Sequence, residues 1–207
     1  MFRCPEITNL LLFALQRDQA VKEIIVIDNT QDGTKVFESS DKVRYIRQLK
    51  NIYVNPAWNL GVSLANEEYI ALVNDDITIP EQIFSTISTI PLENIGILGA
   101  CHPYIRQVQT PNRFRITDFN ITAANERMWG YGIFMVMAKK NYIEIPDEMK
   151  VWCGDDYLFH QNKAAGRTNG MFLFDIQTKM STTSDDTSFD EIKQNDIHIY
   201  ESQYKIN

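Results

Sequence analysis

The sequence Tyr69-Ile-Ala-Leu-Val-Asn-Asp-Asp76 places an apolar run directly before two adjacent carboxylates. Such a run is typical of a β-strand that is buried on both faces, as in a parallel sheet. A second run of this type, Glu23-Ile-Ile-Val-Ile-Asp28, also ends in an aspartate. Ligands bind at the carboxyl ends of the strands in open α/β sheets. The two runs therefore predict a binding site around Asp28, Asp75 and Asp76.

Helical patterns alternate with these strands along the first hundred residues. Apolar spacing and turn residues predict helices over 7–15, 56–67, 80–90 and 155–165, and further strands over 43–46, 52–54, 95–98, 113–118, 133–138 and 171–175. Gly166 is placed to end the last helix. The alternation predicts an α/β fold with a mostly parallel central sheet flanked by helices, and a smaller antiparallel part in the second half.

Composition and charge restrict the class of protein. The chain has 207 residues, of which 44% are hydrophobic and 23% charged, as in ordinary globular domains. The net charge of -7 argues against nucleic acid as the main partner, because phosphate binding needs a basic surface. Three cysteines without zinc-type spacing indicate free thiols in a reducing compartment. No apolar run reaches about 18 residues, so we expect a cytoplasmic protein with no membrane span.

Two pairs of adjacent aspartates are the first candidates for chemistry. Asp75 and Asp76 repel each other unless water or a cation separates their charges, and Mg²⁺ and Mn²⁺ are often shared between carboxylates and a substrate's phosphates. The alternative is an aspartate-rich turn that caps the next helix. Asp155 and Asp156 begin a predicted helix, where their charge suits the helix dipole. The functional alternative is that Asp156 is a general base for an attacking hydroxyl.

Three further positions have weaker signals. Asp28 either hydrogen-bonds a nucleotide base or ribose, or begins a side-chain-stabilised turn. Asn59, near a helix start, either approaches a ribose or phosphate or belongs to an ordinary capped helix. Alternation along Asp196-Ile-His-Ile-Tyr200 puts His198 on one strand face, as a third metal ligand or as an exposed histidine. Cys153 precedes two acidic residues that raise a thiol pKa, which excludes it as a nucleophile.

Taken in order, these motifs resemble those of the GT-A glycosyltransferases, especially the inverting family 2 with its rhamnosyltransferase-like members. The matching segments are Glu23-Ile-Ile-Val-Ile-Asp-Asn29 with Asp32-Gly-Thr34, Asn59-Leu-Gly-Val-Ser-Leu-Ala65, the strand ending in Asn74-Asp-Asp76, Trp129-Gly-Tyr-Gly-Ile-Phe-Met135, and Gly154-Asp-Asp-Tyr157. The resemblance extends from about residue 3 to residue 166. It implies one GT-A domain over residues 1–207, with a nucleotide-sugar-binding half (1–100) and an acceptor-side half (101–207).

The resemblance also implies roles for individual residues. Substrate would be bound by Asp28 (at the base), Asn59 (at the nucleotide), Asn74 and Asp75 (near the ribose and metal), Gly130 and Tyr131 (around the donor sugar and acceptor), and Asp155. Asp76 would ligate Mn²⁺ or Mg²⁺, with His198 as a further ligand, and Asp156 would be the catalytic base. Two features depart from the family: most of its first buried strand is missing ahead of Arg3, and the metal motif begins with Asn74 instead of aspartate.

The expected reaction is the transfer of a sugar from a nucleotide sugar to an acceptor hydroxyl, with inversion at the anomeric carbon. A UDP-sugar is the preferred donor and a dTDP-sugar the second choice, and the acceptor is a glycan, glycoprotein or glycolipid. One alternative is a sugar nucleotidyltransferase, although the sequence shows no glycine-rich loop for a triphosphate. The other alternative is a non-catalytic GT-A-like binding domain.

Overall fold

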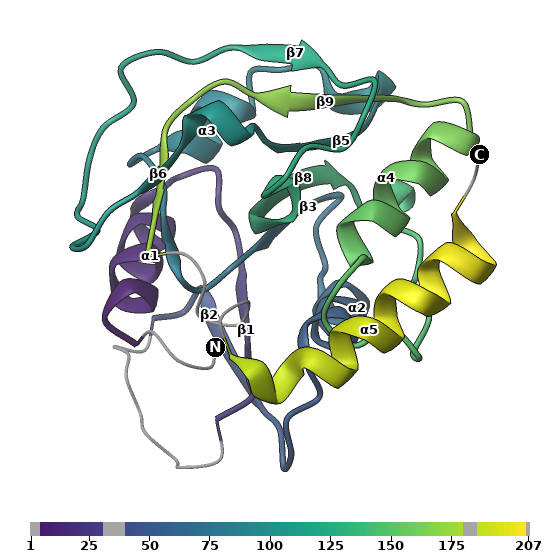
Figure 1. The fold of residues 1–207 in the computed structure, drawn as a ribbon. Coiled ribbons are helices and arrows are strands. Elements are labelled where there is room, and N and C mark those ends of the chain that lie inside the picture. Colours follow the sequence, from purple (N-terminus) through teal and green to yellow (C-terminus); the bar gives the residue numbers. More distant parts are fainter. Residues whose placement is uncertain (1–4, 31–39, 180–185, 206–207) are drawn as a thin grey trace.

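The computed structural model describes residues 5–30, 40–179 and 186–205, and its helices and strands alternate along the first half of the chain (Figure 1). The helices are α1 (Pro5–Arg17), α2 (Val54–Leu64), α3 (Ile83–Ile87), α4 (Gly154–Ala164) and α5 (Asp190–Ile199), which continues into a π-turn over Tyr200–Tyr204. The strands are β1 (Ile24–Asp28), β2 (Val43–Arg47), β3 (Tyr69–Val73), β4 (Ile77–Thr78), β5 (Ile95–Ala100), β6 (Ile105–Gln107), β7 (Ile121–Ala123), β8 (Phe134–Ala138), β9 (Thr168–Phe172) and β10 (Ile176–Thr178).

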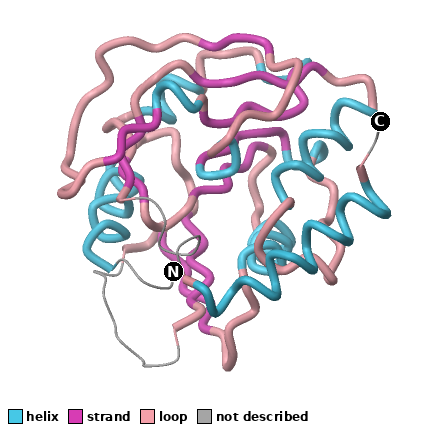
Figure 2. The backbone as a smooth tube through the Cα atoms, in the orientation of Figure 1, coloured by secondary structure: helices cyan, strands magenta, loops and turns pink. Residues whose placement is uncertain are grey.

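The described strands form three sheets. The largest has the order β3-β8-β5-β9-β7, a second contains β4-β10-β6, and β1 pairs with β2 alone. Helices lie on both sides of these strands, with α1 and α3 on one side and α2, α4 and α5 on the other (Figure 2). The predicted α/β class is therefore confirmed. Among the described residues, no helix has the length and apolar character needed to cross a bilayer.

The strand directions differ from the mostly parallel sheet that the sequence predicts. In the largest sheet only β5 and β9 are parallel, whereas β3–β8, β5–β8 and β7–β9 are antiparallel. The reason is the position of β8, which comes from the second half of the chain and inserts between β3 and β5. All five residues of β8 are buried. The parallel relationship of β1 and β2 agrees with the prediction.

Several predicted elements are confirmed and others are wrong. Strands β1, β2, β3, β5 and β8 and helices α2 and α4 fall where the sequence predicts them, and Gly166 adopts the left-handed conformation that ends α4, with φ 76°. The predicted strand over 113–118 is only an isolated bridge at Arg115. The predicted strand over 52–54 instead leads into α2, and the predicted helix over 80–90 is limited to α3.

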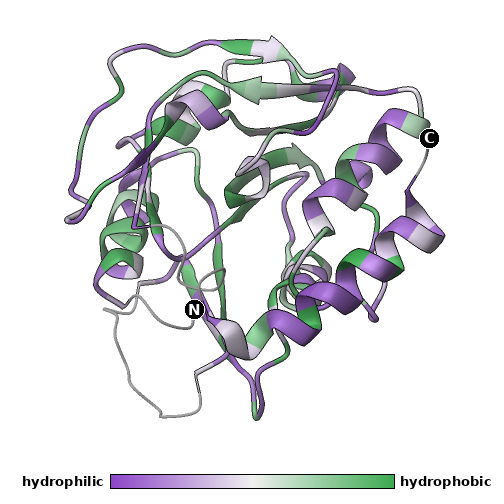
Figure 3. Cartoon of the chain, viewed as in Figure 1, coloured by the Kyte–Doolittle hydropathy of each residue, from purple (hydrophilic) through white to green (hydrophobic). Residues whose placement is uncertain are grey.

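Buried apolar residues form two clusters. Hydrophobic colouring in Figure 3 falls on much of the strands and on parts of the helices. The first cluster joins α1 and α3 to β1 and the sheet, through residues such as Leu12, Val26 and Ile83. The second joins α2 and α4 to the opposite side, through residues such as Val62 and Leu158. The two clusters hold the carboxyl ends of β1 and β3 and the start of α4 in fixed positions.

The end of α1 is tied to the start of α3 by a buried carboxylate. Asp18 is 1% exposed and accepts hydrogen bonds from the backbone N–H groups of Phe84 (2.8 Å) and Ser85 (3.2 Å) and from the Ser85 hydroxyl (2.6 Å). Helix α3 begins after Gln82 without a side-chain cap of its own residues. Asp18 therefore supplies the cap from a distant part of the sequence.

We predict that Asp18→Ala lowers the free energy of unfolding by about 2–4 kcal/mol, because two partly buried N–H groups lose a charged acceptor. Chemical denaturation followed by circular dichroism measures this change. The matched control is Asp41→Ala at an exposed position, which should change stability by no more than about 0.5 kcal/mol. Equal effects of the two substitutions would show that the Asp18 cap does not contribute to stability.

Candidate functional site

The turn after β3 is held in place through its backbone. The hydroxyl of Thr8 in α1 donates to the carbonyl oxygen of Asp75 (3.0 Å), and the hydroxyl of Thr178 in β10 donates to that of Asp76 (3.1 Å). The N–H of Asn74 also donates to the segment before β8. Because backbone groups make these contacts, they fix the turn without using the carboxylates of Asp75 and Asp76.

A cavity of about 780 Å³ begins at this turn, and Asn74, Asp75 and Asp76 are among its lining residues. Its walls near the turn also include Asn29, which follows β1, and Tyr53, which precedes α2. This volume lies within the range of small-molecule sites. The structure therefore brings three of the predicted site residues to one cavity, and adds Asn29 to them.

Asp28 lies next to this cavity but its side chain is already occupied. It is 3% exposed and accepts hydrogen bonds from the Thr30 N–H (3.0 Å) and hydroxyl (2.6 Å) and from the Arg47 guanidinium (3.2 Å). Burial raises the pKa of Asp28, but the hydrogen bonds from Thr30 and Arg47 outweigh it and leave the pKa below its usual value. This geometry matches the side-chain-stabilised turn, and the cavity lining contains Asn29 in place of Asp28.

Asn59 has a different position from the one the sequence predicts. Its amide nitrogen donates to the Ile145 carbonyl oxygen (2.8 Å), and its amide oxygen accepts from the Ile145 N–H (3.0 Å) and the Tyr142 hydroxyl (2.6 Å). The side chain therefore fastens α2 to the segment that follows β8. The prediction that Asn59 holds the nucleotide is corrected accordingly, because these three bonds use its amide.

Tyr131 also proves to be a core residue. Its side chain is 0% exposed, and its hydroxyl lies 3.0 Å from the Ile97 carbonyl oxygen and 2.9 Å from that of Gly170. It cannot line an open substrate site in this conformation, so the prediction for Tyr131 is corrected. Gly130 precedes it with φ 76°, and a Cβ atom there would lie 2.4 Å from the Ile105 side chain. The left-handed φ favours glycine at position 130, whereas the contact is with a terminal methyl group of Ile105 that can move aside.

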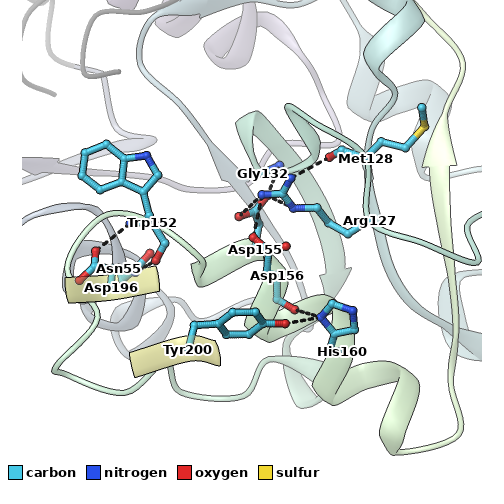
Figure 4. A network of polar contacts seen from close by, with 10 residues as sticks. All are labelled: Asn55, Arg127, Met128, Gly132, Trp152, Asp155, Asp156, His160, Asp196 and Tyr200. Carbon is cyan, nitrogen blue, oxygen red and sulfur yellow. Dashed lines mark hydrogen bonds and ion pairs between the residues drawn. The ribbon is translucent and has the colours of Figure 1, made fainter. Parts of the chain in front are cut away.

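The acid pair at the start of α4 binds an arginine that the sequence analysis did not identify. Nε of Arg127 lies 3.1 Å from a carboxylate oxygen of Asp155, and Nη2 lies 2.7 Å from one of Asp156 (Figure 4). The N–H of Gly132 donates to the same Asp155 oxygen (3.1 Å). Arg127 is 24% exposed, so the ion pairs are partly shielded from water. In the sequence, Arg127 is marked only by its position two residues before the Trp129–Met135 segment.

The surroundings of Asp156 make it a stronger base than a solvent-exposed aspartate. Burial raises its pKa, and the negative charge of Asp155 raises it further. The charges of Arg127 and His160 act in the opposite direction, but the net pKa remains above the usual value. A carboxylate with a raised pKa accepts a proton from a hydroxyl more readily, provided that it is ionised.

The loop before α4 is held from two sides. Asp196 in α5 is 0% exposed, and its carboxylate accepts hydrogen bonds from the N–H groups of Lys150 (2.9 Å), Val151 (2.7 Å) and Trp152 (2.9 Å). From α2, the Asn55 amide donates to the Trp152 carbonyl oxygen (3.1 Å; Figure 4). These contacts fix the loop that delivers Asp155 and Asp156 to the site.

Cys153 ends this loop in a conformation unusual for a residue with a side chain. Its φ is 61°, in the left-handed region. Burial raises the pKa of its thiol to about 12, and the charges of Asp156 and Asp155 contribute. The predicted absence of nucleophilic character at Cys153 agrees with this pKa.

His198 does not occupy the predicted position. Residues 190–199 form α5 and not a strand, so Asp196 and His198 point to different sides of a helix. Asp196 is buried whereas His198 is exposed. Within the described part of the chain, no group of three or more histidine, cysteine, aspartate or glutamate side chains could hold a metal ion. The structure therefore does not combine His198 with Asp75 and Asp76 as a metal site.

The α/β fold, the acidic turn after β3 and the acid pair at the start of α4 together define the GT-A class. Residues 3–145 match the family described as Glycosyl transferase family 2. This match covers more than half of the chain, which therefore belongs to that family. The match ends before α4, so Asp155 and Asp156 lie beyond it, whereas Arg127, which binds them, lies within it.

Comparison with solved structures supports the same fold. The crystal structure of S. aureus TarS, residues 1–349, is similar with a TM-score of 0.55 and 14% sequence identity. The similarity covers 99% of this chain but 65% of that one, so this chain spans less than two thirds of the TarS structure. No curated protein matches the sequence.

We predict that Asp196→Ala lowers the free energy of unfolding by about 3 kcal/mol, because it leaves three partly buried N–H groups without their charged acceptor. Urea denaturation measures the change. His198→Ala in the same helix is the matched control and should alter stability by less than about 0.5 kcal/mol, since His198 is exposed. An equal loss of stability in His198→Ala and Asp196→Ala would show that the Asp196 carboxylate does not hold the loop before α4.

Proposed function

We propose that the protein is a metal-dependent glycosyltransferase that moves a sugar from a nucleotide sugar to an acceptor hydroxyl, with inversion of the anomeric carbon. The observation that carries this proposal is the acid pair of Asp155 and Asp156, bound by Arg127 at the start of α4. Membership of glycosyltransferase family 2 supports the reaction class. A UDP-sugar is the proposed donor, and a glycan, glycoprotein or glycolipid provides the acceptor hydroxyl.

The donor end of the site is the cavity at the turn after β3. Asn29, Asn74, Asp75 and Asp76 are among its lining residues, and this polar end suits a nucleotide better than an apolar ligand. One or two carboxylates are enough for Mn²⁺ or Mg²⁺ when the substrate's phosphates and water supply the other oxygen ligands. These carboxylates therefore fit a metal ion that is shared with the phosphates of the nucleotide sugar, with Asp76 as its principal protein ligand. When bound, such a metal offsets the negative charge that develops on the departing diphosphate.

The acceptor end of the site is the start of α4. Asp156 accepts the proton of the acceptor hydroxyl while that oxygen forms a bond to the anomeric carbon. In the same step the bond between that carbon and the nucleotide diphosphate breaks, so attack and departure occur on opposite faces. Arg127 orients the two carboxylates and keeps Asp156 ionised against the effects of burial and of Asp155. The substrate contact proposed for Asp155 is limited to its outer side, since Arg127 and the Gly132 N–H bind its oxygens.

The donor proposal predicts that UDP with Mn²⁺ raises the melting temperature by about 5–10 °C at a concentration near one hundred times its Kd. A thermal-shift assay with a panel of nucleotides and nucleotide sugars, with and without Mn²⁺, measures the effect. Asp76→Ala should abolish the Mn²⁺-dependent part of the shift because it removes the metal ligand. The control is Asp118→Ala, an exposed carboxylate away from the cavity lining.

Three outcomes of that assay separate the functions. A metal-dependent shift with diphosphates that is lost in Asp76→Ala agrees with a transferase. A shift with nucleoside triphosphates alone would contradict the proposed transferase and indicate a nucleotidyltransferase. If no nucleotide shifts the melting temperature of a sample that unfolds cooperatively, the transferase proposal is wrong. The protein is then a binding domain of another specificity.

The base assignment predicts that Asp156→Asn lowers the rate of sugar transfer by about 10²- to 10⁴-fold while the thermal shift with UDP and Mn²⁺ is kept. The rate of the unaltered protein should fall as pH decreases through the raised pKa of Asp156, because the protonated form cannot accept a proton. Arg127→Gln removes a charge that lowers this pKa, so the acid limb of the pH–rate profile should move to higher pH. Near-normal transfer by Asp156→Asn would rule out this residue as the base.

A further inference from the structure

Tyr53, the residue before α2, has a backbone conformation that suits glycine and almost no other residue. Its φ is 68° and its ψ is -173°. In this region the Cβ atom of any other residue crowds the backbone. Such strain persists only where the surrounding structure enforces it, and it is concentrated at active sites and ligand clamps. A glycine would follow the same path without strain, so the path of the chain does not account for a tyrosine here.

Two asparagine side chains hold this conformation in place. The Asn29 amide oxygen accepts a hydrogen bond from the Ile52 N–H (3.2 Å), and the Asn29 amide nitrogen donates to the Tyr53 carbonyl oxygen (3.4 Å). The Asn51 side chain accepts a hydrogen bond from the Tyr53 N–H (2.8 Å). The backbone of Tyr53 is therefore fixed through its own N–H and C=O groups and through the preceding N–H, as a strained residue requires.

The Tyr53 ring meets that of Phe189 edge to face, with the ring centroids 6.4 Å apart and an angle of 86° between the planes. Phe189 is 8% exposed, whereas Tyr53 is partly exposed. Both residues line the cavity, together with Asn29 and Asn51. In an edge-to-face pair, each ring keeps at least one face that its partner does not cover. Phe189 therefore supports the Tyr53 ring and leaves it a face for contact with a planar ligand.

The position of Tyr53 suits the base of a nucleotide. Its hydrogen bond to Asn29, which follows β1, ties it to the end of the cavity that also contains Asp75 and Asp76. In the proposed function, the diphosphate and the metal lie at these carboxylates, so the base is the flat part of the donor that still needs a contact surface. Every nucleobase has a π-face that can stack on an aromatic ring.

We propose that Tyr53 stacks on the base of the donor nucleotide, and that its strained backbone is retained because it directs the ring into the cavity. This inference rests on the nucleotide-sugar donor of the proposed function, and it adds a residue for the base to the carboxylates for the metal. A glycine at position 53 would relieve the strain but remove the ring. Stability and nucleotide binding therefore place opposite demands on this position, and the two can be measured separately.

The binding test compares Tyr53→Gly, Tyr53→Ala and Tyr53→Phe in the full chain by calorimetric titration with UDP and Mn²⁺, or with another nucleoside diphosphate if the thermal-shift panel selects it. Tyr53→Gly and Tyr53→Ala should weaken UDP binding by roughly 5- to 100-fold, as expected for the loss of one base-stacking ring. Tyr53→Phe keeps the ring and should stay within about threefold of the unaltered protein. Pyrophosphate with Mn²⁺ has no base, so its affinity should be the same for all four proteins.

The stability test uses the two variants without a ring as matched controls for each other. Tyr53→Gly and Tyr53→Ala differ chiefly in backbone strain. Without ligand, Tyr53→Gly should melt about 2–6 °C above Tyr53→Ala, because only glycine adopts this conformation easily. Stacking predicts an equal loss of UDP affinity in both variants despite this difference in stability.

Two results would overturn this inference and leave the transferase proposal intact. The first is UDP binding by Tyr53→Gly at the affinity of the unaltered protein. The second is an equal loss of UDP and pyrophosphate binding, because the effect would then not concern the base. If the unaltered protein binds no nucleotide, the proposed function and this inference both fail.

Discussion

Two like charges at the start of α4 can stand together in a partly buried position only because a guanidinium lies between them. Arg127 contacts Asp155 and Asp156 at 3.1 Å and 2.7 Å, and the Gly132 N–H adds a further contact to Asp155. Removing one partner of such a group leaves an uncompensated charge, which is costly in the interior. The glycine at position 132 and the raised pKa of Asp156 both depend on this cluster. A Cβ atom at Gly132 would lie 2.8 Å from the Asp155 side chain, so the close approach depends on glycine.

The residues that support this cluster come from distant parts of the chain. Asn55 in α2 and Asp196 in α5 hold the loop over 149–153. Arg127, which precedes β8, binds the two carboxylates at the start of α4. Tyr200 adds a contact from the C-terminal side, since its hydroxyl lies 2.5 Å from Nδ1 of His160 in α4. The C-terminal helix is therefore part of the site's framework, although it lies outside the segment that matches the family.

The sequence predicted those parts of the fold that local patterns determine. Strands β1, β3 and β8 form where apolar runs predict them, although only β8 is buried at every residue. Gly166 ends α4 because only glycine adopts its conformation easily. Strand order was not predictable in the same way, because nothing in residues 134–138 indicates that they insert between β3 and β5. Residues 113–118 alternate like a strand but lack a paired neighbour beyond one bridge. The alternation of Asp196, His198 and Tyr200 predicts a strand, but the segment is helical. The buried residues Asp196 and Tyr200 are four positions apart, as on one side of a helix.

Site residues could be predicted from the sequence only where the residue type alone indicates a chemical role. Paired carboxylates were found from their spacing, but the partners of a side chain depend on the tertiary fold. Asn59 and Tyr131 have residue types that suit ligand binding, and the structure uses both for internal hydrogen bonds. Arg127 and Asn29 had no pattern that marked them, because each acquires its position through contacts with segments far away in the sequence.

The raised pKa of the Cys153 thiol affects how this site tolerates oxidants. Its sulfur lies beside the acid pair, and a thiol with a pKa of about 12 is almost entirely protonated at neutral pH. The thiolate is the form that attacks peroxides and alkylating reagents, so this cysteine reacts slowly despite its place next to the proposed base. Burial, with the charges of Asp156 and Asp155, thus protects the neighbouring sulfur from chemical modification.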